Sequence, residues 1–291
     1  MASTTFLDKT LLAIARTAEQ SLFSERYANR RGLLQSLDIR FQIFTFLLIL
    51  VLISFLHDPR SLWLVYAASL ALAAWSRVPL WFFVKRVWLF VPLFTAAIVL
   101  PAMLNIVTPG EPVLVLVELS RDYAWGPYTI PREIAVTRQG VWGGVVIVSR
   151  VAASVSFAVL FTMTRRWADI FAGLRAFFVP RVFVMTLSMT ERYLFVFLRL
   201  IQDMYRARKS RTIRPGSAAF ERTWIASRIG VTFRKSVEMS EDVYRAMLSR
   251  GFHGEFRAVD RFRSGPADYL WLTAVLAAGS AVMMFDRGVL R

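Results

Sequence analysis

The chain has 291 residues, of which 56% are hydrophobic and 19% charged, and this composition favours an integral membrane protein over a soluble domain. The absence of cysteine excludes disulfide scaffolds, zinc–cysteine sites, Fe–S clusters and thiol catalysis. The net charge of +16 favours basic segments on the cytoplasmic face of a lipid bilayer over a nucleic-acid partner, because the chain is so apolar.

Apolar stretches predict the membrane spans in chain order. Residues 4–26 are amphipathic and lack an uninterrupted apolar run, so no cleavable signal peptide is expected. A spanning helix needs about 20 mostly apolar residues. About five stretches approach this requirement, the second being short: 41–56, 62–75, 88–107, 141–163 and 269–285.

A further apolar stretch, 183–201, carries Glu191, Arg192 and Arg199. Charges at the bilayer centre cost about 2.5–3.5 kcal/mol each on insertion scales. Wound as a helix, the stretch is amphipathic, and we predict that it lies at the interface or against protein. Two of the predicted spans also carry small-residue faces that favour close helix packing: Gly140, Gly144, Ala152 and Ser156, and Ala274, Ala277, Ala278 and Ala281.

The connecting segments differ in charge. Residues 1–40 hold six basic and four acidic side chains, and 164–181 hold four basic and one acidic. Residues 201–266 are the most basic, with 14 basic and seven acidic, whereas 108–139 hold three basic and four acidic. The positive-inside rule therefore predicts a cytoplasmic N-terminus, cytoplasmic 164–181 and 201–266, and an outer loop at 108–139.

The expected fold class is all-α integral membrane, with about five transmembrane helices and a cytoplasmic or interfacial set of long amphipathic helices. We predict four parts, in chain order: a cytoplasmic amphipathic segment at 1–40, a membrane domain of four spans at 41–181, a cytoplasmic helical domain at 182–266 and a last span at 267–291.

One short motif occurs twice in the predicted cytoplasmic part. Residues 205–211 and 244–250 share Y-R-A-x-x-S-R, with five identities in seven positions. The first copy is followed by Thr212 and soon by Pro215-Gly216, the second by Gly251, and these residues are typical of helix ends. A guanidinium at a helix end can bind carboxylates and carbonyls of a partner protein. Anionic lipid is the alternative partner, but lipid attraction requires no duplicated sequence context.

The helix that leads into the second copy is predicted to be amphipathic, and the helix ending in the first copy is its expected partner. Its predicted packing residues lie on one face, together with the small Ser236 and Ser240: Ile229, Phe233, Val237, Val243 and Met247.

These features resemble the T component of energy-coupling factor (ECF) transporters, of the CbiQ type. Ser210-Arg211-Thr212 and Ser249-Arg250-Gly251 occupy the places of two Ala-Arg-Gly-like motifs at the ends of the family's coupling helices, with Thr for Gly in the first. Leu37-Asp38-Ile39-Arg40 is similar to the family's Leu-Asp-Pro-Arg element before the first span, and Glu191-Arg192-Tyr193 to an Arg-Tyr element of the long helix. The similarity extends from about residue 20 to about residue 260.

The resemblance implies a non-catalytic subunit that joins two cytoplasmic ATP-binding-cassette ATPases to a membrane substrate-binding subunit, in a bacterial-type inner (cell) membrane. It implies that Ser210, Arg211, Thr212, Ser249, Arg250 and Gly251 contact grooves on the ATPases, and that cobalt or nickel is taken up. The chain lacks the phosphate-binding pattern G-x-x-x-x-G-K-[ST], which agrees with ATP binding by a partner.

Three alternatives remain open: a T component of a vitamin importer, a self-sufficient ion transporter, and a membrane enzyme acting on lipids. A transporter would require inverted repeats and polar residues at the midplane, and an enzyme clustered acidic or histidine residues. Arg150, like the charges of 183–201, can mark a transport path or pair between helices, and pairing is favoured. No cofactor or metal site is expected, since His57 and His253 lack neighbouring ligands at metal spacing.

Overall fold

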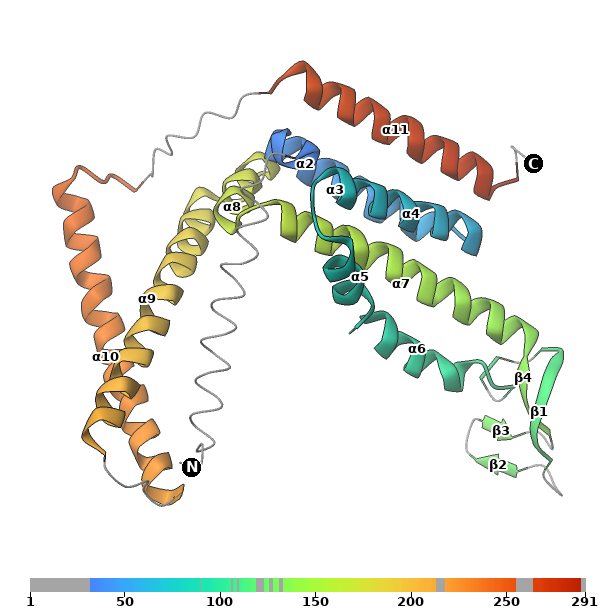
Figure 1. The fold of residues 1–291 in the computed structure, drawn as a ribbon, viewed down its shortest axis with the longest axis horizontal. Coiled ribbons are helices and arrows are strands. Elements are labelled where there is room, and N and C mark those ends of the chain that lie inside the picture. Colours follow the sequence, from blue (N-terminus) through green and yellow to red (C-terminus); the bar gives the residue numbers. More distant parts are fainter. Residues whose placement is uncertain are drawn as a thin grey trace. The chain divides into compact units, whose positions relative to one another are not determined.

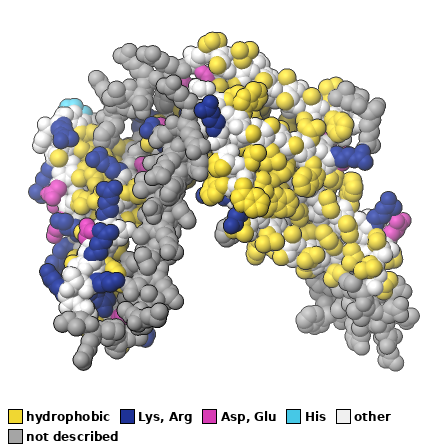
Figure 2. Space-filling view, in the orientation of Figure 1, with side chains coloured by type: hydrophobic (Ala, Val, Ile, Leu, Met, Phe, Trp, Pro, Cys, Tyr) yellow, Lys and Arg dark blue, Asp and Glu magenta, His cyan; other side chains and the backbone are white. Residues whose placement is uncertain are grey.

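A computed structural model describes residues 32–89, 91–105, 107–108, 110–118, 123–125, 128–130, 133–212, 218–254 and 264–288. These residues form two compact units, which are described separately. The membrane unit contains the described residues of 32–166 and 264–288, and the helical-pair unit contains those of 167–254. On the face drawn in Figure 2, apolar side chains cover the helices of the membrane unit, and Lys and Arg side chains gather over the helical-pair unit.

The central helix of the membrane unit is α7 (Arg138–Thr164) (Figure 1). The helices that pack against it are α3 (Ile39–Phe55), α4 (Pro59–Trp75), α5 (Leu80–Trp88) and α6 (Val91–Ala102). The last helix, α11 (Pro266–Asp286), packs on α3 and α4, and the short α2 (Leu33–Ser36) precedes α3. The hydrophobic core lies among these helices, and its largest fully buried side chains include Phe83, Ile53, Leu62, Leu160 and Met163.

The apolar helices confirm the predicted fold class, a multi-pass all-α membrane protein. Within the described ranges, three helices are long and apolar enough to cross a membrane: Leu80–Ala102, α7 and α11. The predicted first and second spans form the 17-residue helices α3 and α4. The predicted third span starts earlier than expected, at Leu80, because apolar residues flank Lys85 and Arg86, whose charges had suggested a loop.

The small-residue face of α7 packs closely against the end of α6, as its composition predicted. A Cβ at Gly140 would lie 2.7 Å from the carbonyl oxygen of Met103, and one at Gly144 would lie 2.2 Å from Met103 Cε. Ala152 and Ser156 are also buried. Replacing Gly140 would push the backbone at Met103 away from α7, whereas replacing Gly144 would require the Met103 and Val99 side chains to move.

The alanine face of α11 is exposed, in contrast to that of α7 (Ala274, Ala277, Ala278 and Ala281). This helix packs through its other side, where Trp271 and Val282 meet the core and a Cβ on Gly279 would lie 2.6 Å from Leu52. Trp271, Val282 and Gly279 therefore mark the packing side of α11, and the alanines do not.

The turn between α3 and α4 is held by one charged side chain from each of two other helices. Arg150 of α7 donates from Nη2 to the carbonyl of Leu56 at the end of α3, at 2.7 Å. Asp286, at the end of α11, accepts from the backbone N–H groups of His57 at 3.1 Å and Asp58 at 2.9 Å. A cation at a helix C-terminus and an anion at a helix N-terminus both oppose the helix dipole. Arg150 therefore pairs between helices, which was the favoured interpretation.

The opposite end of α3 is held in the same way. Arg165, which follows α7, donates to the carbonyls of Leu34, at 2.9 Å, and Leu37. Asp268 of α11 accepts from the backbone N–H of Asp38 at 2.7 Å. Asp38 is the N-cap of α3, which explains the acidic residue just before the predicted first span. At each end of α3, an arginine on or just after α7 and an aspartate of α11 hold the chain.

The segment between α6 and α7 contains two antiparallel β-ribbons, which the all-α prediction did not include. β1 (Pro112–Glu118) pairs with β4 (Glu133–Thr137), and β2 (Tyr123–Trp125) pairs with β3 (Tyr128–Ile130). β4 runs directly into α7, because the Thr137 hydroxyl accepts from the backbone N–H of Gly140 at 3.1 Å and caps the helix.

The helical-pair unit consists of two short and two long helical segments. α8 (Trp167–Leu174) and a 3-10 turn (Arg175–Phe177) lead into α9 (Arg181–Arg211), which α8 contacts. α10 (Ala218–Ser249) follows. The predicted interfacial stretch 183–201 is part of α9, and α9 is not among the helices that meet the length and hydropathy of a membrane span.

Replacing Arg150 with methionine should destabilise the membrane unit. The change removes the donor to the buried Leu56 carbonyl, and an unsatisfied buried acceptor costs about 1–3 kcal/mol. We expect a lower thermal unfolding midpoint in detergent, followed by tryptophan fluorescence. Arg60→Met, on the exposed side of the same turn, is the matched control and should leave the midpoint unchanged. Equal midpoints for the two variants would contradict the capping role of Arg150.

Candidate functional site

The first copy of the repeated motif ends α9. Arg211 is the last residue of this helix and is exposed. The hydroxyls of Ser210 and Thr212 donate to the carbonyls of Ala207 and Arg208, each at 2.9 Å. These bonds satisfy carbonyls that the end of a helix would leave without partners. The flanking hydroxyls are thus bound to their own helix, and Arg211 is the charged residue between them.

The second copy ends α10 in a Schellman turn. Gly251 has φ +78°, the left-handed conformation that glycine adopts without steric cost. The backbone N–H of Phe252 donates to the carbonyl of Met247 at 3.1 Å, and that of Gly251 to Leu248 at 2.9 Å. The helix end predicted at Gly251 is confirmed. Arg250, directly before the glycine, is exposed.

Thr212 replaces glycine in the first motif because α9 ends differently. Thr212 is extended, with φ −107° and ψ 112°, a conformation that suits a β-branched residue. The end of α9 is held near the start of α10 by Arg208, whose guanidinium carbon lies 4.5 Å from the centre of the Trp224 ring and 5.8 Å from that of Phe220. Cation–π contacts of this kind contribute about 0.5–1 kcal/mol when exposed.

The two motif arginines lie at opposite ends of α10. Arg208 of α9 contacts Trp224 near the start of α10, and this contact brings the end of α9, with Arg211, close to the start of α10. Arg250 directly follows the last residue of α10. An α-helix rises about 1.5 Å per residue, so α10, with 32 residues, is about 48 Å long, and the two arginines lie near its two ends. The motifs therefore lie at two separate places on the helical pair.

The predicted packing residues of α10 divide into two groups. Val243 and Met247 line a groove of about 670 Å³ between α9 and α10. Ile229, Phe233 and Val237 are exposed, at 66%, 70% and 45%. The sequence grouped all five on one face, whereas the structure brings only the C-terminal two toward α9.

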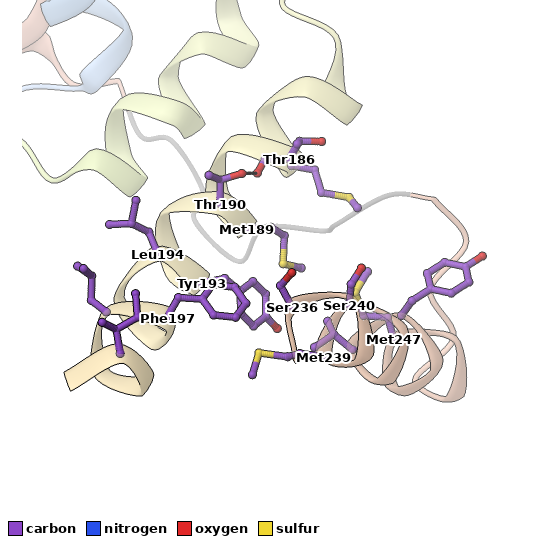
Figure 3. A pocket seen from close by; sticks show the side chains of 15 residues that line it. Thr186, Met189, Thr190, Tyr193, Leu194, Phe197, Ser236, Met239, Ser240 and Met247 are labelled. Carbon is purple, nitrogen blue, oxygen red and sulfur yellow. Dashed lines mark hydrogen bonds between the residues drawn. The ribbon is translucent and has the colours of Figure 1, made fainter. Parts of the chain in front are cut away.

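The position of the groove explains this division. Groove residues recur every fourth position on α9, at Met185, Met189, Tyr193, Phe197 and Ile201, and on α10, at Ser236, Ser240 and Tyr244. They line an open space between the two helices, and Ile229, Phe233 and Val237 lie outside it. Figure 3 shows Met189 and Tyr193 of α9 facing Ser236 and Met239 of α10 across the groove.

A second recess, of about 890 Å³, adjoins the groove at the end of α10, and Met189 and Tyr193 line both. Arg250 and His253 line it from the second motif, and Arg192 lines it from α9. Two guanidinium groups on one recess attract an anionic group. Sequence reasoning did not place Arg192 in the site, although its resemblance to the family's Arg-Tyr element was a signal.

Metal-ligating side chains do not gather in the part of the chain that the structure describes, where no group of three or more His, Asp or Glu could hold an ion. The two histidines lie in different units. The backbone N–H of His57 is bound by Asp286, and His253 lines the recess of Arg250.

Comparison with known families identifies the chain. The family described as CbiQ, cobalt transport protein, matches residues 31–259, which include both arginine motifs. The chain belongs to the CbiQ family. It is accordingly a membrane transport component, as its repeated motif and apolar helices suggested.

Two relatives of this CbiQ protein differ in how far they match. An uncharacterised protein of Methanocaldococcus jannaschii is 31% identical over 285 residues, which cover 97% of this chain and 93% of the relative. The nickel permease LarQ of Lactiplantibacillus plantarum is 28% identical over 116 residues, 40% of this chain and 42% of the permease.

Two glycine-to-alanine changes, one within α10 and one just after it, should change the stability of this helix in opposite directions. Neither added Cβ would meet an atom within 4 Å, but Gly251 has a positive φ and Gly230 lies within the helix. Gly251→Ala should destabilise the helix end by about 1–2 kcal/mol, and Gly230→Ala should stabilise the helix by about 0.5–1 kcal/mol. Hydrogen exchange of α10 amides measures both. Equal protection of the last turn in the two variants would refute the Schellman cap.

Spin labels at the two motif arginines should report a long distance. Because the chain has no cysteine, Arg211→Cys and Arg250→Cys can be labelled together without background. Pulsed electron resonance should give a distribution of label-to-label distances centred at about 48 Å. A dominant distance below about 30 Å would show that the motifs come together at one contact point.

Proposed function

We propose that this CbiQ-family protein is the T subunit of an ECF importer for cobalt or nickel. In this role it links two cytoplasmic ATP-binding-cassette ATPases to a membrane substrate-binding subunit and catalyses no reaction itself. The observation that carries the proposal is the repeated motif, whose final arginines, Arg211 and Arg250, lie near opposite ends of α10. A sequence repeated at two points, about one long helix apart, suits two similar partners.

The chemistry of the motifs supports contact with protein. The hydroxyls of Ser210, Thr212 and Ser249 are bound to carbonyls of their own helices, which leaves the arginines to contact a partner. A guanidinium presents several donors in a fixed plane and can bind carboxylates or carbonyls in an ATPase groove. Arg192 adds a second cation beside Arg250, so the ATPase at this end is expected to supply at least one carboxylate.

The choice of metal is proposed to lie in the substrate-binding partner. The family's description names cobalt, and the name of the relative LarQ names nickel. The N-terminus and both motifs are proposed to be cytoplasmic, in a bacterial-type inner (cell) membrane, because residues 1–40, 164–181 and 201–266 are the basic segments of the chain.

The helical pair suits transmission of motion. Arg208 and Trp224 hold the end of α9 to the start of α10, whereas the groove nearer the other end is lined by four methionines: Met185, Met189, Met239 and Met247. Methionine side chains are flexible and repack at low cost. Closure of the ATPases would thus change the angle between α9 and α10 about the Arg208 contact.

Reversing both motif charges tests the proposal. The Arg211→Glu/Arg250→Glu variant should lose at least about 30-fold in affinity for the ATPases, since breaking a desolvated charge pair costs about 2–5 kcal/mol. Metal uptake by cells should fall with it, while the amount of protein in the membrane stays unchanged. Co-purification in mild detergent followed by mass spectrometry measures the first effect.

The matched control is Arg199→Glu/Arg234→Glu, which makes the same charge change at exposed arginines of α9 and α10 outside the motifs. This control should retain both ATPase binding and uptake. Unaltered uptake by the motif variant would refute the assignment of the motifs. Metal transport by the purified chain alone in proteoliposomes would instead establish a self-sufficient transporter.

A further inference from the structure

β1 is apolar on both of its faces. Three consecutive side chains are exposed, Val113 by 64%, Leu114 by 58% and Val115 by 44%. Val113 lies in a β-bulge, whereas Leu114 and Val115 pair in regular register with Val136 and Ala135, so the side chains of these two neighbours point to opposite faces and neither face is fully covered. Antiparallel ribbons with one face in water alternate apolar and polar residues, and a two-stranded ribbon is only marginally stable alone in water. The composition of β1 therefore requires an apolar environment outside the chain.

The ribbon is attached to the ends of two membrane helices. Thr137, the last residue of β4, is the N-cap of α7, and its backbone N–H donates to the carbonyl of Met103 at 3.0 Å, just beyond α6. The N–H of Asn105 donates to the carbonyl of Ala135 in β4 at 2.9 Å. The base of the ribbon therefore lies where α6 and α7 end. Figure 1 shows β1 and β4 bending away from the axis of α7 instead of extending it.

The exposed surface of α6 leads to the ribbon. Its outward side chains are apolar and more than half exposed: Leu93, Phe94, Ile98 and Leu100. Val107, between α6 and β1, is 56% exposed, and Trp142, near the start of α7, is 58% exposed. Tryptophan is enriched where a membrane meets water. Since α6 and α7 belong to membrane spans, the apolar surface of β1 continues a surface that faces lipid.

The unpaired edge of β1 limits how deep the ribbon can lie. Among the described strands, β1 pairs only with β4, so its other edge carries backbone N–H and C=O groups without strand partners. Hydrocarbon cannot satisfy such groups, whereas water and lipid headgroups can. Glu111 and Arg138, at the base, form an exposed ion pair at 4.0 Å, which also belongs in a polar layer.

We propose that the β1–β4 ribbon lies in the interfacial layer of the bilayer, with the Val and Leu side chains of β1 on lipid and its outer edge among headgroups. Lipid is the single occupant that offers apolar contact to both faces and polar groups to the edge. The ribbon would then fix the depth at which α6 and α7 end. This proposal does not depend on the ATPase contacts proposed above.

Single cysteines at Leu114 and Val115 test the proposal, because these neighbours are in regular register and point to opposite faces, and the chain has no other cysteine. The full chain, labelled with an environment-sensitive fluorophore, is reconstituted alone in phospholipid vesicles. Both positions should show blue-shifted emission. Lipids with a nitroxide near the headgroup should quench both at least about twofold more than lipids with a nitroxide at mid-chain, and aqueous iodide should quench them weakly.

Phe94→Cys on α6 is the lipid-facing control, and Asp242→Cys on α10 is the water-facing one. Iodide quenching without lipid quenching at Leu114 and Val115 would show that the ribbon lies in water. Lipid quenching at only one of them, or protection of both from every quencher, would show that protein covers at least one face. Each of these three results would overturn the proposal.

Discussion

The membrane unit depends on how the ends of α3 are satisfied. The end of one helix leaves carbonyls, and the start of the next leaves N–H groups, without partners inside the helix. Arg150 and Asp286 satisfy the α3–α4 turn, and Arg165 and Asp268 hold the segment before α3. Charged residues in and beside the spans thus have a structural role, and the apolar packing of α3 rests on them.

This arrangement explains why the last helix packs with the first helices of the chain. Both aspartates come from α11, so the membrane unit is complete only when α11 has packed on α3 and α4. The helical pair is inserted in sequence between α7 and α11. The chain therefore leaves this bundle after α7 and returns to it at α11.

Local rules predicted the features that depend on local sequence. Hydropathy located the spans, and Gly251 marked the end of α10 because a single residue's φ decides such a turn. The exposure of Ile229 and Phe233 depends on how two helices cross, and the place of Arg192 beside Arg250 depends on contacts 58 positions apart in the chain. The β1–β4 ribbon was missed because a run of Val and Leu between prolines suits several structures.

The two aspartates are synthesised long after the backbone groups that they bind. Asp268 and Asp286 bind backbone groups 230 and 228 residues earlier in the chain. At about 5–20 residues per second, a ribosome needs roughly 10–45 s to add that length. For the first part of this interval the α3–α4 turn has neither charged partner, and once α7 is made it has Arg150 but still no aspartate. The nascent bundle therefore stays incomplete until the helical pair has been made, and a chain that stops before α11 presents the quality-control machinery with unpaired N–H groups.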